Sequence, residues 1–331
     1  MVELSIGKLR GLEQLANSDG IFVMCAMDHR GSLQKMLDEE NPKAVSYRTM
    51  VNYKLDLCRA LAHHASAVLL DPVYGASQAI AAGVLPGSTG LLVSMEATGY
   101  SGSKEERINE LLPGWSVEKA KRLGASAIKL LLYYRSDLGD VASKQLDLVK
   151  GLAYECLERD IPFLVEPKSY PVGMVEGNPE KFARIKPQLV IETAHEVTAL
   201  PIDVLKAEFP ADLNYERDEA RLLEFCRQLD RASRVPWVIL SAGVDFQLFY
   251  KQVEIACKAG ASGFLAGRAL WQEATHIRSR TERMRFLEST VADRLRQLAR
   301  VASTYGTPWY TKLGAKKYQL ASVGEGWYEQ Y

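Results

Sequence analysis

Short apolar runs alternate with amphipathic stretches along the first 275 residues of the chain. Eight runs have the apolar character of buried strands, and they cover residues 21–28, 66–72, 90–99, 126–134, 161–167, 202–210, 236–243 and 262–269. Between most of these runs, apolar residues recur at positions i, i+3, i+4 and i+7, a spacing that predicts helices. Clear examples are 46–64, 143–160, 218–233 and 245–260, the last of which ends in the plausible cap Gly260.

This alternation predicts the fold class. Strands that alternate with helices form parallel sheets, and eight such units predict a single-domain α/β fold, the (β/α)8 TIM barrel. The alternative is an open, doubly wound sheet, which usually carries a glycine-rich fingerprint after its first strand. The corresponding segment here, DHRGSL at residues 28–33, holds one glycine. The pattern therefore favours the barrel.

The chain continues beyond the last predicted strand. We expect residues 1–275 to form the barrel and residues 276–331 to form a C-terminal extension that packs on it. The extension begins with a basic amphipathic helix near residues 283–303. It ends in an aromatic tail, which holds Tyr305, Trp309, Tyr310, Tyr318, Trp327, Tyr328 and Tyr331. Such a tail is typical of packing against the barrel or a partner subunit, and the alternative is a lid over the barrel mouth.

Composition narrows the class of protein. The 331 residues include 41 basic and 41 acidic side chains, so the net charge is zero, which argues against binding nucleic acid through bulk charge. No apolar run approaches the roughly 20 residues of a membrane span, and the first residues lack a signal-peptide core. The five cysteines are dispersed without CxxC spacing. We therefore expect a cytoplasmic protein with no nucleic-acid or membrane partner. We also expect a homo-oligomer, a dimer or larger.

Charged residues gather where the predicted strands end. In a barrel of this kind, chemistry takes place at the C-terminal ends of the strands. The sequence places there Asp28, His29, Arg30, Asp71, Glu96, Lys129, Glu166, Lys206, Glu208 and Arg268. A lone carboxylate such as Asp71, which precedes Pro72, is more typical of a turn cap. Because buried charges are costly unless they are paired, the whole set indicates a site.

Two of these residues are lysines, which suggests a specific chemistry. Desolvation and a second nearby cation both lower the pKa of a lysine amine, and a neutral amine can attack a ketone to form a Schiff base. A carboxylate must then move protons. Glu166 can do so, and so can Glu208, which shares a predicted strand face with Lys206.

The last two predicted strands suggest an anion site. Ser241, Gly243 and Gly267 leave backbone amides exposed, and barrels often bind phosphate after strands 7 and 8. Arg268 adds a guanidinium group that suits the same anion.

Several segments, taken in order over residues 10–275, form a specific set: MDHRGSL, ASAVLLDPVYG, LLVSMEATGY, GASAIKLLLYY, FLVEP, IDVLKAEFP, WVILSAGVDFQLF and GASGFLAGRALW. This set resembles the class I tagatose 1,6-bisphosphate aldolases and their relatives, the sulfofructosephosphate aldolases. The resemblance implies a (β/α)8 lyase that acts on a phosphorylated or sulfonated ketose through a Schiff base and needs no metal or other cofactor.

The resemblance also assigns residues. Lys206, in VLKAE, matches the family's nucleophile. The other catalytic positions match Lys129 as second lysine, Glu166 as acid/base and Asp28 as the first-strand aspartate. The phosphate contacts match Ser241, Gly243, Gly267 and Arg268, and Arg30 matches a residue for the distal anionic group. His29 stands where the family is expected to have glutamine, so recognition of a substrate hydroxyl or of the distal anion is expected to differ there.

The sequence thus predicts a class I aldolase that reversibly cleaves a ketose 1,6-bisphosphate, such as tagatose 1,6-bisphosphate, into dihydroxyacetone phosphate and glyceraldehyde 3-phosphate. One alternative is cleavage of sulfofructose 1-phosphate into dihydroxyacetone phosphate and sulfolactaldehyde. Another is a barrel that binds sugar phosphates without turnover, which has no need for Lys206, Lys129 and Glu166 together. A metal-dependent aldolase usually needs several histidines, and only His29 of the five lies at a predicted strand end.

Overall fold

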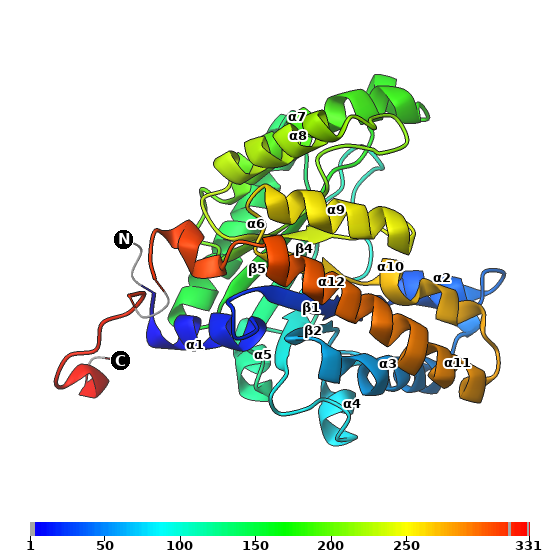
Figure 1. The fold of residues 1–331 in the computed structure, drawn as a ribbon, viewed down its shortest axis with the longest axis horizontal. Coiled ribbons are helices and arrows are strands. Elements are labelled where there is room, and N and C mark those ends of the chain that lie inside the picture. Colours follow the sequence, from blue (N-terminus) through cyan, green and yellow to red (C-terminus); the bar gives the residue numbers. More distant parts are fainter. Residues whose placement is uncertain (1–3, 317–318, 330) are drawn as a thin grey trace.

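A closed barrel of parallel strands forms the centre of the computed structural model, which describes residues 4–316, 319–329 and 331. The strands within these residues are β1 (Phe22–Ala26), β2 (Ala67–Leu70), β3 (Gly90–Ser94), β4 (Ala127–Tyr133), β5 (Phe163–Lys168), β6 (Val204–Ala207), β7 (Trp237–Leu240) and β8 (Gly263–Ala266). Each strand pairs with the next in chain order, and β8 pairs with β1, which closes the sheet. Figure 1 shows strands at the centre of the molecule with helices around them. The predicted (β/α)8 TIM barrel is confirmed.

Helices follow the strands and cover the outside of the barrel. They are α2 (Gly31–Leu37), α3 (Tyr47–Leu61), α4 (Ala76–Ala81), α5 (Val117–Leu123), α6 (Gly139–Glu158), α7 (Pro179–Val197), α8 (Glu219–Ala232), α9 (Phe246–Lys258) and α10 (Arg268–Trp271). Local sequence sets where these helices begin. The Ser46 side chain accepts a hydrogen bond from a backbone amide in the first turn of α3, and the Asp245 side chain accepts one from the first turn of α9. Gly260 has φ +119° and follows the C-cap residue of α9, close to the predicted end.

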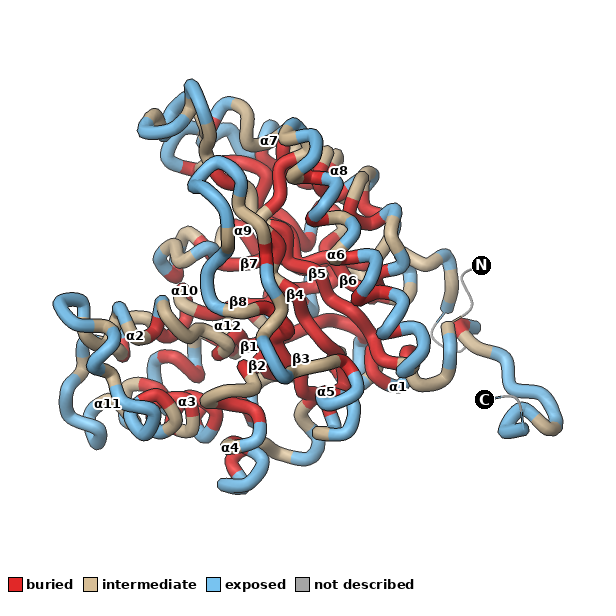
Figure 2. Tube along the Cα trace, turned by 180° about the vertical axis from the view of Figure 1, so that it is seen from behind, coloured by how far each residue is buried: buried red, intermediate tan, exposed pale blue. Residues whose placement is uncertain are grey.

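Most strand residues are buried, as the red tube at the centre of Figure 2 shows. Their outward side chains pack against the helices. The inward side chains of the lower barrel form a separate apolar layer: Phe22, Met24, Ala67, Leu69, Leu92, Ala127, Leu164, Val204, Val238 and Leu265. Side chains two residues further along a strand point the same way. Lys129, Glu166 and Lys206 follow Ala127, Leu164 and Val204 at that spacing, so a charged layer lies directly above the apolar one.

The C-terminal extension begins as one long helix and packs on the barrel. Its parts are α11 (Arg280–Phe286), a π-helical turn (Leu287–Val291) and α12 (Ala292–Tyr305), which lies along α9. The tail then returns to the N-terminal end of the barrel, where Trp309 stacks on Phe22 with ring centroids 6.5 Å apart.

The tail and α1 (Ile6–Leu15) together close this N-terminal end. Leu320 is buried in the same apolar cluster as Leu12 and Leu15 of α1, and its carbonyl accepts from the Leu4 amide at 2.7 Å. Figure 1 shows both termini at this end, away from α2 and α10 at the mouth. This placement is opposite to the one that a lid requires; Tyr318 of the predicted aromatic set lies outside the described residues.

The five cysteines are buried free thiols, and burial raises the pKa of each. Such thiols are poor nucleophiles. Among the described residues, no helix is both long enough and apolar enough to cross a membrane.

Candidate active site

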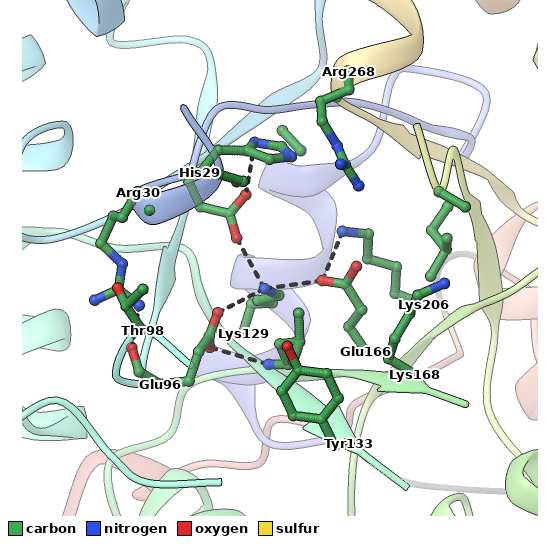
Figure 3. Close-up of a pocket in the computed structure, with 18 of the residues that line it drawn as sticks. His29, Arg30, Glu96, Thr98, Lys129, Tyr133, Glu166, Lys168, Lys206 and Arg268 are labelled. Atoms are coloured by element: carbon green, nitrogen blue, oxygen red, sulfur yellow. Dashed lines mark hydrogen bonds and ion pairs between the residues drawn. The ribbon is translucent and has the colours of Figure 1, made fainter. Parts of the chain in front are cut away.

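Charged side chains from five strands meet in the barrel mouth. Lys129 lies on β4, Glu166 on β5 and Lys206 on β6, and all three point inward. Asp28 and Glu96 each stand two residues beyond the end of their strands, β1 and β3. Figure 3 shows the side chains of Glu96, Glu166 and Lys206 arranged around Lys129.

Lys129 is the centre of this cluster. Its Nζ lies 2.9 Å from an Asp28 oxygen, 2.8 Å from a Glu96 oxygen and 2.9 Å from a Glu166 oxygen. Burial by itself lowers the pKa of an ammonium group, but the three carboxylates outweigh it and hold the pKa of Lys129 well above its ordinary value. Lys129 is therefore a fixed cation at neutral pH.

Lys206 shares one of these carboxylates. Its Nζ lies 2.8 Å from Oε2 of Glu166, the oxygen that also contacts Lys129. Burial by itself raises the pKa of Glu166. The two lysines lower it by more than burial raises it, so the pKa of Glu166 lies below its ordinary value. The pKa of Asp28 is also lowered, since Lys129, His29 and Lys206 together overcome burial. The cluster thus places an amine beside ionised proton acceptors in a largely buried position.

The turn after β7 and the start of α10 form the predicted anion corner. Ala242 and Gly243 both have positive φ, at +48° and +80°, so the chain turns sharply after β7. A Cβ atom on Gly243 would lie 3.1 Å from the guanidinium carbon of Arg268. The Gly267 amide donates to Ser241 Oγ at 3.4 Å. A guanidinium group beside the Ser241 hydroxyl and small turn residues suits a phosphate.

His29 lies beneath this corner, with its ring edge against Trp271 at a centroid distance of 5.0 Å. Burial lowers the pKa of His29 to about 3, helped by Arg268 and against the pull of Asp28. Its Nδ1 is buried and, in the part of the chain that the structure describes, has no hydrogen-bond partner. Nδ1 lies 3.7 Å from an Asp28 oxygen, so His29 is a neutral ring beside that carboxylate.

Arg30 stands across the mouth from Arg268, and Figure 3 shows Lys129 between the two. Its guanidinium group donates to the carbonyl oxygen of Glu96. The mouth thus carries positive charge on two sides of the lysines.

Glu208 is not brought into this cluster. Strand β6 ends at Ala207, so the side-chain alternation that predicted a shared face with Lys206 stops there. The Glu208 carboxylate accepts from the Ser169 amide at 2.7 Å and pairs with Lys168. It lines a separate small cavity between β6 and α7, so its predicted place in the substrate site does not agree with the structure.

Asp71 also lies apart, as its sequence suggested. Its Oδ1 accepts from the amides of Val73 and Tyr74 at 2.9 and 2.8 Å, while Oδ2 pairs with the buried Lys54. Asp71 therefore fixes a turn.

The mouth encloses a cavity of about 450 Å³. Its lining includes these predicted residues: Asp28, His29, Arg30, Lys129, Glu166, Lys206, Ser241, Gly267 and Arg268. Gly243 lies against Arg268 without lining the cavity.

Other lining residues carry no prediction from the sequence: Thr98, Arg107, Tyr133, Lys168, Ser169 and Tyr170. Strand periodicity could have found Tyr133 and Lys168, because they lie four and two residues beyond Lys129 and Glu166 on the same strands. Arg107 comes from the loop after β3, where no period applies.

Comparison with known proteins agrees with this geometry. Residues 22–273 match a family model described as DeoC/LacD family aldolase. The chain is 35% identical to tagatose 1,6-diphosphate aldolase of Streptococcus agalactiae over 80% of this chain and 85% of the relative. It is 34% identical to tagatose 1,6-diphosphate aldolase 1 of Enterococcus faecalis, over 82% and 86%.

Solved structures share the fold. An archaeal fructose 1,6-bisphosphate aldolase superposes with a TM-score of 0.60 at 21% identity, over 89% of this chain and 99% of that one. Fructose-bisphosphate aldolase from Plasmodium falciparum gives a TM-score of 0.69 at 14% identity, over 92% and 97%.

Proposed function

Since the chain belongs to the DeoC/LacD family of aldolases, we propose that it is a class I aldolase that reversibly cleaves a ketose 1,6-bisphosphate, such as tagatose 1,6-bisphosphate. The products are dihydroxyacetone phosphate and glyceraldehyde 3-phosphate. The relatives named for tagatose 1,6-diphosphate support this substrate class. The observation that carries the chemistry is the single Glu166 oxygen shared by Lys206 and Lys129.

Substrate binding places the ketone beside Lys206. The C1 phosphate of the open-chain sugar binds at Ser241, Gly267 and Arg268, with Gly243 shaping the turn that holds Arg268. The carbon chain then runs across the charged layer. Arg30, which lines the cavity beside Glu96, is assigned to help with the distal anionic group.

The first chemical step forms the Schiff base. Glu166 takes one proton from the Lys206 ammonium group with which it is paired, and the amine so formed attacks C2. That proton and a second one from the same nitrogen pass through Glu166 to the departing oxygen, so that water leaves and a protonated iminium remains. Glu166 is within 2.8 Å of the amine, which is the distance such a proton transfer needs. Lys129 stays charged and, together with Asp28, holds Glu166 and a substrate hydroxyl in place.

The second step breaks the C3–C4 bond. The Glu166 carboxylate takes the proton of the C4 hydroxyl, and the electrons of the C3–C4 bond move to the iminium nitrogen. The aldehyde product leaves and an enamine remains on Lys206. A proton returned to C3, followed by addition of water to the iminium, frees dihydroxyacetone phosphate and restores the amine.

Borohydride trapping tests the nucleophile. Dihydroxyacetone phosphate with borohydride should add irreversible mass to the peptide that contains Lys206, and K206M should lose this label. K168M is the matched control, because Lys168 also lines the cavity but pairs with Glu208; it should keep the label. Mass found at Lys129 instead would overturn the assignment.

A cleavage assay tests the substrate. Tagatose 1,6-bisphosphate, fructose 1,6-bisphosphate and sulfofructose 1-phosphate are compared by release of dihydroxyacetone phosphate. The proposal expects the highest kcat/KM with a bisphosphate. Faster cleavage of sulfofructose 1-phosphate would favour the sulfonate alternative, and tight binding without turnover of any of the three would favour a binding protein.

We also propose a cytoplasmic homo-oligomer. The five buried, free thiols support a reducing compartment. Cell fractionation tests the location, and light scattering on the purified protein tests the oligomeric state.

A further inference from the structure

A small hairpin rises from the loop after β3 at the rim of the cavity. Ser101 and Ile108 exchange backbone hydrogen bonds of 2.9 and 3.0 Å, and Glu96 and Leu111 form a second antiparallel bridge. The hairpin carries Arg107, whose side chain lines the cavity.

Buried amide side chains fix this hairpin to the end of β4. The carbonyl of Arg107 accepts from Gln145 Nε2 at 3.1 Å, and Gln145 Oε1 accepts from the Asn109 amide at 3.1 Å. The Asn109 side chain in turn donates to the Leu131 carbonyl at 2.8 Å and accepts from the Tyr133 amide at 2.7 Å. Because Gln145 and Asn109 are both buried, these hydrogen bonds hold the backbone of Arg107 in one place.

Three tyrosine rings hold the guanidinium group itself. The Arg107 Cζ atom lies 4.9 Å from the ring centroid of Tyr100, 5.3 Å from that of Tyr133 and 4.4 Å from that of Tyr170. The Tyr170 hydroxyl donates to the carbonyl of Glu105 at 3.2 Å, which ties the hairpin to the end of β5. Burial raises the pKa of Tyr133 and of Tyr170, so both rings stay neutral. Such stacking orients the cation without removing its charge.

Arg107 keeps its terminal nitrogens available. Within the described residues it makes no ion pair, and the one hydrogen bond of its side chain runs from Nε to the Lys104 carbonyl at 3.0 Å. Lys168, another cation of the same wall, is paired with Glu208. Arg30 donates to the Glu96 carbonyl. A rigid cation without a carboxylate partner at the edge of a cavity is a site for an anion.

The barrel order places this cation opposite the proximal anion corner. Arg268 follows β8, whereas Arg107 is stacked on residues at the ends of β4 and β5, and β4 lies four strands from β8 around the closed sheet. Lys206 on β6 stands between them. A ketose bound with one phosphate on Arg268 and its C2 at Lys206 therefore extends toward Arg107.

We propose that Arg107 binds the anionic group at the far end of the sugar chain, the 6-phosphate of a ketose bisphosphate or the sulfonate of a sulfoketose 1-phosphate. This inference rests on the proposed function and adds to it the residue that distinguishes a doubly anionic ketose from a singly anionic one. Arg30, which follows β1, also lines the cavity, but its guanidinium group already donates to the Glu96 carbonyl. In Arg107 only Nε is used, so its terminal nitrogens can donate to the anion.

The test compares R107M with K104M. Lys104 belongs to the same hairpin, is exposed and does not line the cavity, so K104M removes an equal charge without removing the contact. For R107M, kcat/KM with the bisphosphate, or with sulfofructose 1-phosphate if that is the better substrate, should fall about 10- to 100-fold, mainly through KM, as expected for loss of charge-assisted hydrogen bonds. K104M should stay within about twofold, and R107K should recover part of the loss.

Dihydroxyacetone phosphate supplies the second readout, because it lacks the distal anion. Its half-saturating concentration for borohydride inactivation should be unchanged in R107M. An equal loss with dihydroxyacetone phosphate, an equal loss in K104M, or no loss with the doubly anionic substrate would each overturn the inference. A wild-type protein that cleaves none of the three sugars would instead remove the proposed function, and this inference with it.

Discussion

Oε2 of Glu166 lies 2.8 Å from Nζ of Lys206 and, at the same time, 2.9 Å from Nζ of Lys129. One carboxylate oxygen thus joins the amine proposed to attack the ketone to a permanently charged neighbour. Glu166 can exchange protons with the reacting nitrogen while its ion pair with Lys129 fixes the orientation of its carboxylate. General acid–base catalysis needs such an arrangement.

The first prediction concerns this carboxylate. E166Q keeps the shape of the side chain but removes the proton acceptor, so kcat should fall about 100- to 10,000-fold. KM should change little, because the anion contacts remain. Steady-state cleavage assays measure both. E208Q is the matched control, since Glu208 is also buried but lines another cavity. Similar losses of kcat in the two variants would contradict the assignment.

The second prediction concerns Lys129. K129M leaves Asp28, Glu96 and Glu166 buried without their shared cation, which should cost about 3–5 kcal/mol in the free energy of unfolding at pH 7. The pKa values of Asp28 and Glu166 are lowered in the folded wild type. Their contribution to stability is therefore present above their unfolded pKa, near 4, and is lost as pH falls through the folded value.

It follows that wild type and K129M should differ most at neutral pH. In the variant the carboxylates lose their cation, so they take up protons more readily and acid relieves their repulsion. The difference should narrow progressively as pH falls from 7 toward 4. Urea unfolding at pH 7, 5.5 and 4 measures it; a difference independent of pH would show that the ion pairs do not stabilise the fold.

The third prediction separates backbone strain from anion binding. G243A places a methyl group 3.1 Å from the Arg268 guanidinium carbon at a φ of +80°. G124A introduces a methyl group at φ +93° in open space, at the end of α5. Both variants should lose about 1–2 kcal/mol of stability from the left-handed backbone. Only G243A should also lower kcat/KM, by about tenfold through KM. Thermal unfolding together with steady-state kinetics tests this, and loss of activity in both would refute it.

The fourth prediction concerns the tail. L320A removes a side chain buried against α1, so the free energy of unfolding should fall by about 2–5 kcal/mol. The kcat should be unchanged at temperatures where the protein is folded, because this contact lies at the end of the barrel away from the mouth. W327A alters an exposed ring and should change stability by about 0.5 kcal/mol at most. Reduced turnover in folded L320A would restore the idea of a lid.

The sequence predicted the barrel and most of the site for a physical reason. Strand periodicity and barrel topology together decide where a residue such as Lys129 or Glu166 must point, so each side chain could be placed without coordinates. Glu208 was assigned to the wrong cavity because strand alternation holds only while the strand lasts, and β6 ends one residue before it. The position of that end depends on pairing with β5 and β7, which a single segment does not reveal.

The sequence predicted that the tail packs on the barrel, but not at which end, and it assigned no role to Arg107, for a different reason. The destination of an aromatic tail is set by which apolar surface is left uncovered, and here that surface lies beneath Phe22. The three tyrosine rings that stack on Arg107 come from three separate segments of the chain, which end or follow β3, β4 and β5. These residues, Tyr100, Tyr133 and Tyr170, are distant in the chain and follow no common spacing.

The apolar layer beneath the charged one has a consequence for how this enzyme can change. The lower half of the barrel, closed by α1 and the tail, holds the strands together without help from the mouth. Substitutions in the hairpin after β3 or in the turn after β7 therefore leave that foundation intact. A change of sugar preference can therefore arise in these loops by single substitutions, each with little loss in the free energy of unfolding.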